Sequence, residues 1–179
     1  MLKNAILIFA VLLFITGKAF GEADVSKFEI FGYRLGMTVD EVRKKNPKID
    51  IQEVKLDDGK VVGYQAYYKK LMFRFSSKEE GARLFHIVYY ELYRTKPDPY
   101  PIVGAYMHRY GMPDSTGRDM WNINVCWGKC YGKNPRMELK MKISGIKGGF
   151  PLNLSLLNPA EEASDWMYFD PDEGVTIKR

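Results

Sequence analysis

The only two cysteines of the chain, Cys126 and Cys130, stand four residues apart in the stretch NINVCWGKC. Residues four apart in an extended strand are about 13 Å from each other, whereas the Cα atoms of a disulfide lie within about 7 Å. The pair can therefore bond only if the chain turns at Trp127-Gly128-Lys129, and Gly128 is the residue that permits such a turn. Because an even number of cysteines pairs by default in an oxidising compartment, the first interpretation is a structural disulfide.

Two other kinds of chemistry remain open for the same sulfurs. A thiol oxidoreductase would use them as a redox pair, although such enzymes usually carry Cys-x-x-Cys at a helix N-terminus. A copper-handling protein would bind Cu(I) through two thiolates and further soft ligands. His108 and Met112 in YMHRYGM would complete that set with Cys126 and Cys130. Under the first interpretation the chain needs no metal and no cofactor.

The remaining polar residues favour a protein without catalytic activity. His86 falls in an apolar stretch and is expected in the core, while His108 follows Met107 in a helix and is expected at the surface. Neither histidine has a nucleophile or a second ligand at motif spacing. The acidic stretch FDPDEG lacks the ligand spacing of a calcium loop. An enzyme of unrecognised type would need a cleft in which one histidine meets a carboxylate.

Tyrosine offers a candidate binding surface. Six tyrosines fall on both faces of two segments that are expected to be strands, and tyrosine is a favoured anchor in protein interfaces. The candidates for partner binding are Tyr64, Tyr67, Tyr68, Tyr89, Tyr90 and Tyr93. The alternative is that helices cover one face of these strands and that the rings simply pack there.

The first 21 residues are predicted to be a cleaved signal peptide. Lys3 precedes an apolar run over 5–15, and Ala19-Phe20-Gly21 supplies small residues before a cleavage site at Glu22. The run is about 11 residues long, roughly half of the ~20 that span a bilayer. We therefore expect an exported protein, periplasmic or secreted, with no stable membrane span after cleavage.

Charge argues against nucleic acid as a partner. The chain carries 27 basic and 22 acidic residues, for a net charge of +5. Removal of Lys3 and Lys18 with the signal leaves +3, and the remaining basic residues alternate with acidic ones along the chain. An exported protein of this composition is expected to meet another envelope or secreted protein.

Two short helices are predicted by their end signals. Thr38 and Glu41 form a capping box, and Asn46-Pro47 ends that helix after barely two turns. In the second helix Asp98 is the N-cap, Pro99 fits the first turn, and Gly111 is the stop signal. Val39 and Val42 in the first helix must hold it by packing.

Alternating apolar residues predict about four strands after the first helix and about three after the second. They cover residues 51–56, 61–70, 71–76, 84–94, 120–127, 136–143 and 150–156. The stretch 84–94 is apolar on both faces, which predicts a central strand covered on each side. In 120–127, Trp121 is expected to face inward with Ile123, Val125 and Trp127.

This order of elements predicts an α+β fold in which each helix precedes an antiparallel meander. Residues 22–179 are expected to form a single domain. Its units would span 28–95 and 97–157, followed by an acidic tail over 158–179, and the two units could be halves of an internal repeat.

Gly36-Met37-Thr38 through Glu41-Val42 resembles the start of small exported domains of the SmpA/OmlA and β-lactamase-inhibitor-protein type. In that family a similar helix entry precedes a short helix and an antiparallel sheet. The resemblance covers under a tenth of the chain. It implies a non-enzymatic envelope protein that binds other proteins through its sheet, stiffened here by a local disulfide. The chain lacks the lipidated cysteine of the outer-membrane assembly lipoproteins, which argues against that specific role. The resemblance transfers no inhibitory or binding residue.

Overall fold

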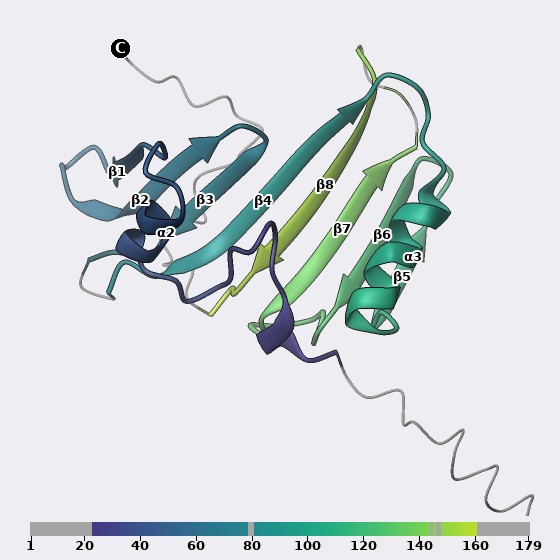
Figure 1. Ribbon diagram of the computed structural model, residues 1–179, viewed down its shortest axis with the longest axis horizontal. Coiled ribbons are helices and arrows are strands. Elements are labelled where there is room, and N and C mark those ends of the chain that lie inside the picture. Colours follow the sequence, from purple (N-terminus) through teal and green to yellow (C-terminus); the bar gives the residue numbers. More distant parts are fainter. Residues whose placement is uncertain (1–22, 79–80, 144, 146–147, 161–179) are drawn as a thin grey trace, which may run out of the picture.

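The computed structural model describes residues 23–78, 81–143, 145 and 148–160. Eight strands form one antiparallel sheet in the order β1-β2-β3-β4-β8-β7-β6-β5 (Figure 1). The predicted signal peptide and residues 161–179 of the predicted tail lie outside the described residues. The elements are η1 (Val25–Lys27), α2 (Val39–Lys45), β1 (Ile51–Lys55), β2 (Val61–Tyr68), β3 (Leu71–Phe75), β4 (Leu84–Tyr93), α3 (Pro99–Tyr110), β5 (Ser115–Arg118), β6 (Asn122–Trp127), β7 (Arg136–Lys142) and β8 (Phe150–Leu157).

The strand order brings the ends of two meanders together at the centre of the sheet. The helix α2 precedes β1 to β4, and α3 precedes β5 to β8. The last strands of the two series, β4 and β8, pair along eight residues, from His86↔Leu157 to Tyr93↔Phe150. The first strands, β1 and β5, form the two edges of the sheet and are only five and four residues long. The predicted α+β class is confirmed.

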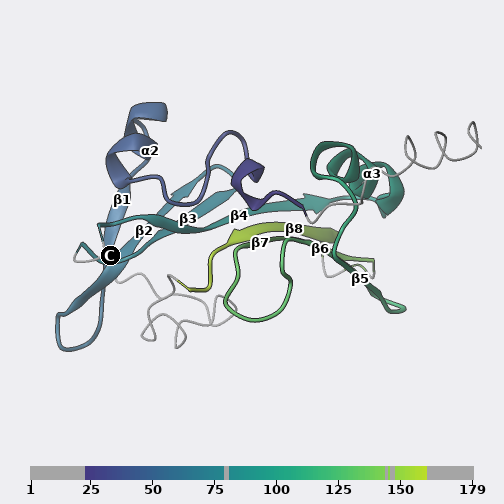
Figure 2. The same ribbon diagram turned by 90° about the horizontal axis from the view of Figure 1, so that it is seen from below.

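Both helices lie on one side of the sheet. Figure 2 shows α2, α3 and the purple segment 23–37 together above the strands. We call this the helix-side face and the opposite one the outer face, which no described helix covers. The helix-side face therefore holds the main core.

The helix ends follow the predicted signals. Thr38 Oγ1 accepts the Glu41 N–H while the Glu41 carboxylate accepts the Thr38 N–H, and α2 ends at Asn46. The side chain of Asp98 caps α3, which ends at Gly111 with a φ of +86°. Since α2 has only seven residues, it depends on burial of Val42 against the sheet.

The core consists of alternate residues from six strands packed under the two helices. Their side chains have exposed fractions of 9% or less. They are Ala66, Leu71, Phe73, Phe75, Leu84, Ile87, Ile123, Val125, Trp127, Met137, Leu139, Met141, Leu152, Leu154 and Leu156. Because the alternation has period two, the polar residues between them lie on the outer face.

Three details of the strand prediction were wrong. The edge strand β5 was missed because Ser115–Arg118 has no apolar residue to mark it. Trp121 is 55% exposed, since β6 begins only at Asn122. The strand β4 is covered on both sides over its first half alone, because Tyr90 and Leu92 are 42% and 41% exposed.

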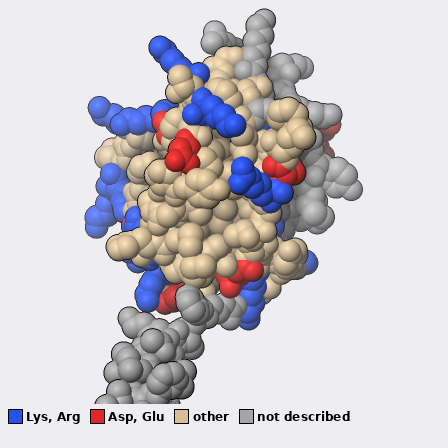
Figure 3. All heavy atoms as spheres, turned by 90° about the vertical axis from the view of Figure 1, so that its right-hand side faces the viewer, with Lys and Arg blue, Asp and Glu red and all other residues tan. Residues whose placement is uncertain are grey.

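Charged residues are scattered over the face of the molecule that Figure 3 shows. On the coloured part of the face in Figure 3, Lys and Arg lie apart from one another, with Asp and Glu between them and large uncharged areas around them. Among the described helices, none has the length and apolarity needed to cross a membrane.

Candidate functional site

An exposed aromatic residue in a tight turn marks the candidate site. Ile30 and Tyr33 exchange two backbone hydrogen bonds of 3.0 Å, so Phe31 and Gly32 form the turn between them. The φ angles are +51° at Phe31 and +78° at Gly32. The Phe31 ring is 66% exposed and packs edge-on against Tyr89 at 5.0 Å. A bulky residue seldom adopts a positive φ, because its side chain then crowds the backbone.

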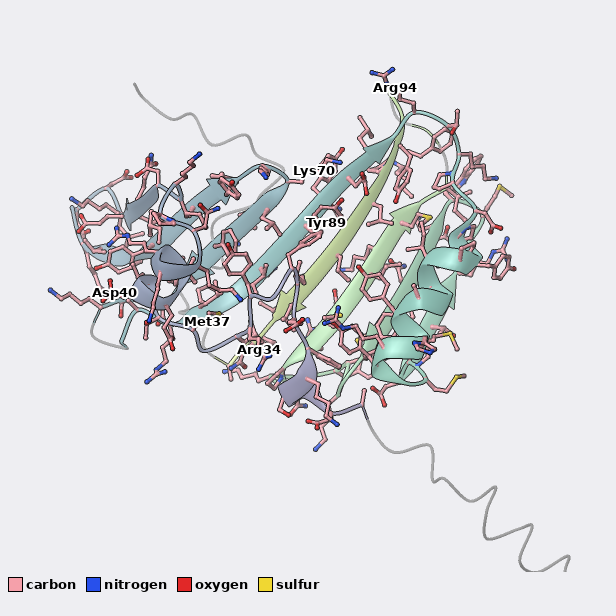
Figure 4. The ribbon with its side chains drawn as sticks, in the orientation of Figure 1. Arg34, Met37, Asp40, Lys70, Tyr89 and Arg94 are labelled. Atoms are coloured by element: carbon pink, nitrogen blue, oxygen red, sulfur yellow. A yellow bond between two sulfur atoms is a disulfide. The ribbon has the colours of Figure 1, made fainter. Side chains whose placement is uncertain are left out.

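The opposite wall of the site is a second tight turn. Tyr68 of β2 pairs with Leu71 of β3, and Lys69-Lys70 connects them. Lys69 has a φ of +55°, so it too is a non-glycine residue in the left-handed region. Figure 4 shows Lys70 and Tyr89 on the helix side of the sheet, close to the strand β4. Together these elements line a pocket of about 410 Å³, the Phe31 pocket, formed by Phe31, Tyr33, Tyr68, Lys69, Lys70, Leu71 and Tyr89.

The C-terminal end of α2 holds two of these tyrosines in position. The side chain of its C-cap, Asn46, lies beside the hydroxyls of both Tyr33 and Tyr68 and acts to lower the pKa of each. The Tyr33 ring is buried against Phe73 at a centroid distance of 4.8 Å. Lys45 Nζ donates to the Gly32 carbonyl at 2.6 Å and lies 5.4 Å from the Tyr33 ring centroid. The short helix therefore fixes both the turn and the floor of the pocket.

The polar groups of the Phe31 pocket are a set of neutral phenols and charged amines. Tyr89 donates to Glu91 at 2.8 Å, and Lys70 pairs with the same carboxylate at 2.6 Å. Burial and this hydrogen bond raise the pKa of Tyr89, while Lys70, followed by Tyr89, lowers the pKa of Glu91. Burial likewise raises the pKa of Tyr33, so its hydroxyl stays protonated near neutral pH. The pocket thus offers aromatic contact with ammonium groups at its rim.

The six predicted tyrosines divide between the two faces of the sheet. Tyr68 and Tyr89 line the Phe31 pocket, and Tyr64 and Tyr93 pack beside the core on the same face. Tyr67 and Tyr90 lie on the outer face, 56% and 42% exposed. Sequence reasoning missed Phe31 and Tyr33, because they precede the first helix and nothing local indicates that they fold over β3 and β4. The dipeptide Phe31-Gly32 was the available turn signal.

The disulfide prediction is confirmed. Cys126 and Cys130 are bonded, with their Cα atoms 6.0 Å apart. Gly128 turns the chain between them with a φ of +78°. A Cβ atom at Gly128 would stand 2.9 Å from the Pro135 carbonyl oxygen and 2.7 Å from Val25 Cγ1. Glycine is thus required here both by backbone conformation and by the close approach of the neighbouring chain.

The alternative copper ligands do not come together. Trp127 Nε1 donates to the Gly111 carbonyl at 3.0 Å, so Trp127 lies on the side of α3. Cys126, one residue earlier in β6, lies on the outer face. His108 is exposed on α3, and Met112 is 51% exposed beyond its end. Within the described ranges, no group of three His, Cys, Asp or Glu side chains could hold a metal ion.

His86 lies in β4 on the outer face. Its Nε2 is 3.0 Å from Ser155 Oγ, and its Nδ1 is buried without a hydrogen-bond partner. The residue pairs with Arg74 of β3, and Glu138, Lys140 and Arg136 of β7 also act on it. Burial, then the charge of Arg74, lowers the pKa of His86 to about 3.

The close packing of Gly128 gives a prediction on stability. We expect Gly128→Ala to lower the free energy of unfolding by about 3 kcal/mol, because it adds backbone strain to a clash. The matched variant Gly132→Ala has a similar φ of +80°, but its added Cβ would meet only Asn134 Nδ2 at an ordinary contact distance of 3.8 Å, so it should cost about 1 kcal/mol. The double variant Cys126→Ser/Cys130→Ser should cost up to about 2 kcal/mol, since the loop is short. Urea unfolding measures all three, and equal losses at the two glycines would contradict the role of the close contact.

The buried His86 predicts loss of stability in acid. In the unfolded chain this histidine binds a proton near pH 6.5, whereas in the folded chain it stays neutral down to about pH 3. Stability should therefore fall as the pH drops through this window, by at most about 1.4 kcal/mol per pH unit. Unfolding measured at pH 7 and pH 5 should show a shallower slope for His86→Gln than for the wild type. The exposed His108→Gln is the control, and parallel slopes for His86→Gln and wild type would contradict the prediction.

No protein-family model, no curated protein and no solved structure matches this chain. The resemblance of the first helix entry to the SmpA/OmlA and β-lactamase-inhibitor-protein type therefore stays a prediction.

Proposed function

We propose that this chain is an exported, non-enzymatic domain of the cell envelope that binds another protein through the Phe31 pocket. The observation that carries the proposal is the pair of strained, exposed residues that form two walls of the pocket. Phe31 and Lys69 are two of three non-glycine residues with positive φ among the described residues. Backbone strain of this kind costs about 1–3 kcal/mol and gathers at functional sites.

The position of Phe31 is costly for stability in two ways. A left-handed φ disfavours a bulky side chain, and 66% of that side chain remains in water. Glycine, as at the neighbouring Gly32, would form the same turn without strain. An aromatic ring held here is understandable if it contacts a partner, because aromatic residues at the centre of an interface contribute most of the binding energy.

The charges around the pocket indicate the chemistry of the partner. Lys69 Nζ lies 5.2 Å from the Tyr68 ring centroid, and Lys70 stands beside it in the same turn. Lys45 adds a third ammonium group close to Tyr33. The Glu91 carboxylate pairs with one of them, Lys70. We expect the partner to present an aromatic or aliphatic side chain next to a carboxylate.

The proposal includes an internal repeat. From the centre of the sheet to its edges, the strands follow the order β4-β3-β2-β1 on one side and β8-β7-β6-β5 on the other. In the sequence, each series of four strands comes after a helix. Both helices lie on the helix-side face. This arrangement supports two copies of one helix–meander unit, over about 28–95 and 97–157, as the resemblance to β-lactamase-inhibitor-type domains implies.

Export is tested on the protein from its native source. We expect mature chains to begin at Glu22 and to weigh two hydrogens less than the reduced form, because the disulfide forms outside the cytosol. N-terminal sequencing and intact mass spectrometry measure both. Chains that begin at Met1 and carry two free thiols would contradict the proposal, as would turnover of a substrate by the two sulfurs.

Binding is tested by relieving the strain at Phe31. We expect Phe31→Gly to change the free energy of unfolding by less than about 1 kcal/mol, because lost contact with Tyr89 offsets relieved strain. The same variant should bind the partner at least tenfold more weakly. The measurement is saturable capture of a protein from native envelope extract by immobilised, oxidised chain, compared between wild type and variant.

Tyr100→Ala is the matched control for this experiment. Tyr100 is 70% exposed and lies at the start of α3, outside the Phe31 pocket. Its loss should leave capture unchanged. A captured protein that binds wild type and Phe31→Gly equally well would overturn the assignment of the pocket, and so would the absence of any saturable binding.

A further inference from the structure

A second pocket lies on the outer face of the sheet, beside the disulfide. The strands β5, β6 and β7 that carry it are neighbours at one border of the sheet (Figure 1). Its volume is about 200 Å³, below the ~300–1,000 Å³ of sites for drug-sized ligands, so its size suits one ring rather than several. We call it the Tyr131 pocket, and the groups that give it its chemistry are Ser115, Asn124, Cys126, Tyr131, Glu138 and Lys140.

Two neighbouring rows of cross-strand partners form the floor of the Tyr131 pocket. They are Ser115-Cys126-Glu138 and Gly117-Asn124-Lys140. Because side chains alternate along each strand, both rows point to the same face. Gly117 leaves the floor open at the edge strand, since a Cβ atom added there would meet nothing within 4 Å. The hollow therefore depends on the missing side chain of Gly117.

The Tyr131 ring forms a wall of the pocket. It is 81% exposed, and it directly follows Cys130, whose disulfide ties this loop to β6. Asn134 Nδ2 donates to the Tyr131 carbonyl at 3.1 Å, and Arg136 donates to the Gly132 carbonyl at 3.1 Å. The loop between β6 and β7 is thus fixed at both ends, and it holds an aromatic ring in water beside a polar floor.

The charges of the floor balance each other. The Glu138 carboxylate accepts from Arg136 Nε at 2.6 Å and pairs with Lys140 Nζ at 2.7 Å. Burial raises the pKa of Glu138, but Lys140 and Arg136 outweigh it and hold the pKa below its usual value. The carboxylate is therefore ionised at neutral pH. Since the ammonium group inside the pocket already faces this carboxylate, the site favours a neutral ligand over an anion.

Donors and acceptors of hydrogen bonds stand close together in the pocket. The Asn124 amide and the Ser115 hydroxyl can each donate and accept, and the Lys140 ammonium has three N–H groups. A sugar ring carries neighbouring hydroxyls that also donate and accept, and its faces carry C–H groups. The negative face of an aromatic ring attracts such weakly positive hydrogens. An apolar ligand would instead leave the polar groups of the floor without partners, which is costly.

We propose that the Tyr131 pocket binds one ring of a neutral saccharide. The Tyr131 ring packs on the C–H face of the sugar, and Asn124, Ser115 and Lys140 hydrogen-bond to its hydroxyls. The pocket lies on the outer face, whereas the Phe31 pocket lies on the helix-side face. This inference therefore does not depend on the proposed function.

Titration of the full, oxidised chain with defined neutral sugars tests the site. The probes are maltose, cellobiose, lactose and N,N′-diacetylchitobiose. At least one of them should bind saturably below about 10 mM, because a ligand ring of about a dozen non-hydrogen atoms supports only modest affinity. Amide nuclear magnetic resonance shifts measure the binding and should be largest around Gly117, Asn124 and Tyr131. Sodium phosphate and sodium acetate, as anionic probes, should not displace the sugar.

Two variants should each weaken sugar binding at least tenfold. Tyr131→Ala removes the stacking ring. Gly117→Leu fills the hollow without backbone strain, since Gly117 has no positive φ. The matched controls are Tyr100→Ala, which removes another exposed tyrosine, and Gly104→Leu, which adds the same side chain to open space on α3. Both controls should bind the sugar as the wild type does.

Four outcomes would overturn the proposal. Absence of saturable binding by all four sugars would show that the pocket is no saccharide site. Equal binding by wild type and Gly117→Leu would place the sugar elsewhere, as would shifts that gather around Phe31. Displacement of the sugar by phosphate or acetate would show an anion site. Far-ultraviolet circular dichroism confirms that each variant remains folded.

Discussion

The strands β4 and β8 pair along eight residues at the centre of the sheet, and every other layer of the molecule depends on this contact. It joins two meanders, β1 to β4 and β5 to β8. Within each meander, every strand pairs with the strand that precedes or follows it in the sequence. Tyr89 pairs with Leu154, 65 positions later in the chain. Because the chain between them must close into a long loop before the pairing forms, this contact costs more loop-closure entropy than a hairpin within either meander. Without it, the two helices would cover separate four-stranded sheets, each with a smaller core than the joined sheet.

The segment 23–37 bridges the two halves on the helix-side face. Glu29 pairs with Arg34 of its own segment and with Arg109 of α3. The Tyr110 hydroxyl donates to the Glu29 carbonyl at 3.0 Å, and Phe28 packs edge-on against the Tyr110 ring at 5.2 Å. At its other end the segment enters α2 through the capping box. Anchorage at both ends explains how the turn at Phe31 can hold an unfavourable φ, since the surrounding contacts outweigh the local strain.

Local signals predicted much of the fold and little of the candidate site. The Thr38–Glu41 capping box, the Asp98 cap and the Gly111 stop lie within a few residues of what they control, so sequence identifies them. The edge strand β5 has no apolar alternation and gave no such signal. The Phe31 pocket combines a turn before α2 with a turn after β2, and only the folded sheet brings these together. Tyr68 and Tyr89 were predicted as site residues because tyrosines are visible within a single strand of the sequence. Phe31 was not, because its contact is with Tyr89, about 60 positions later in the chain.

The two edges of the sheet determine how this molecule can associate with others. At one end β5 offers only four residues, and at the other end β1 carries Glu53 and Lys55 as an exposed ion pair of 2.9 Å. Short, charged borders are poor templates for an added strand. The sheet therefore resists polymerisation into longer ribbons in spite of its eight strands, and recognition of other molecules is left to side chains on its faces rather than to its backbone.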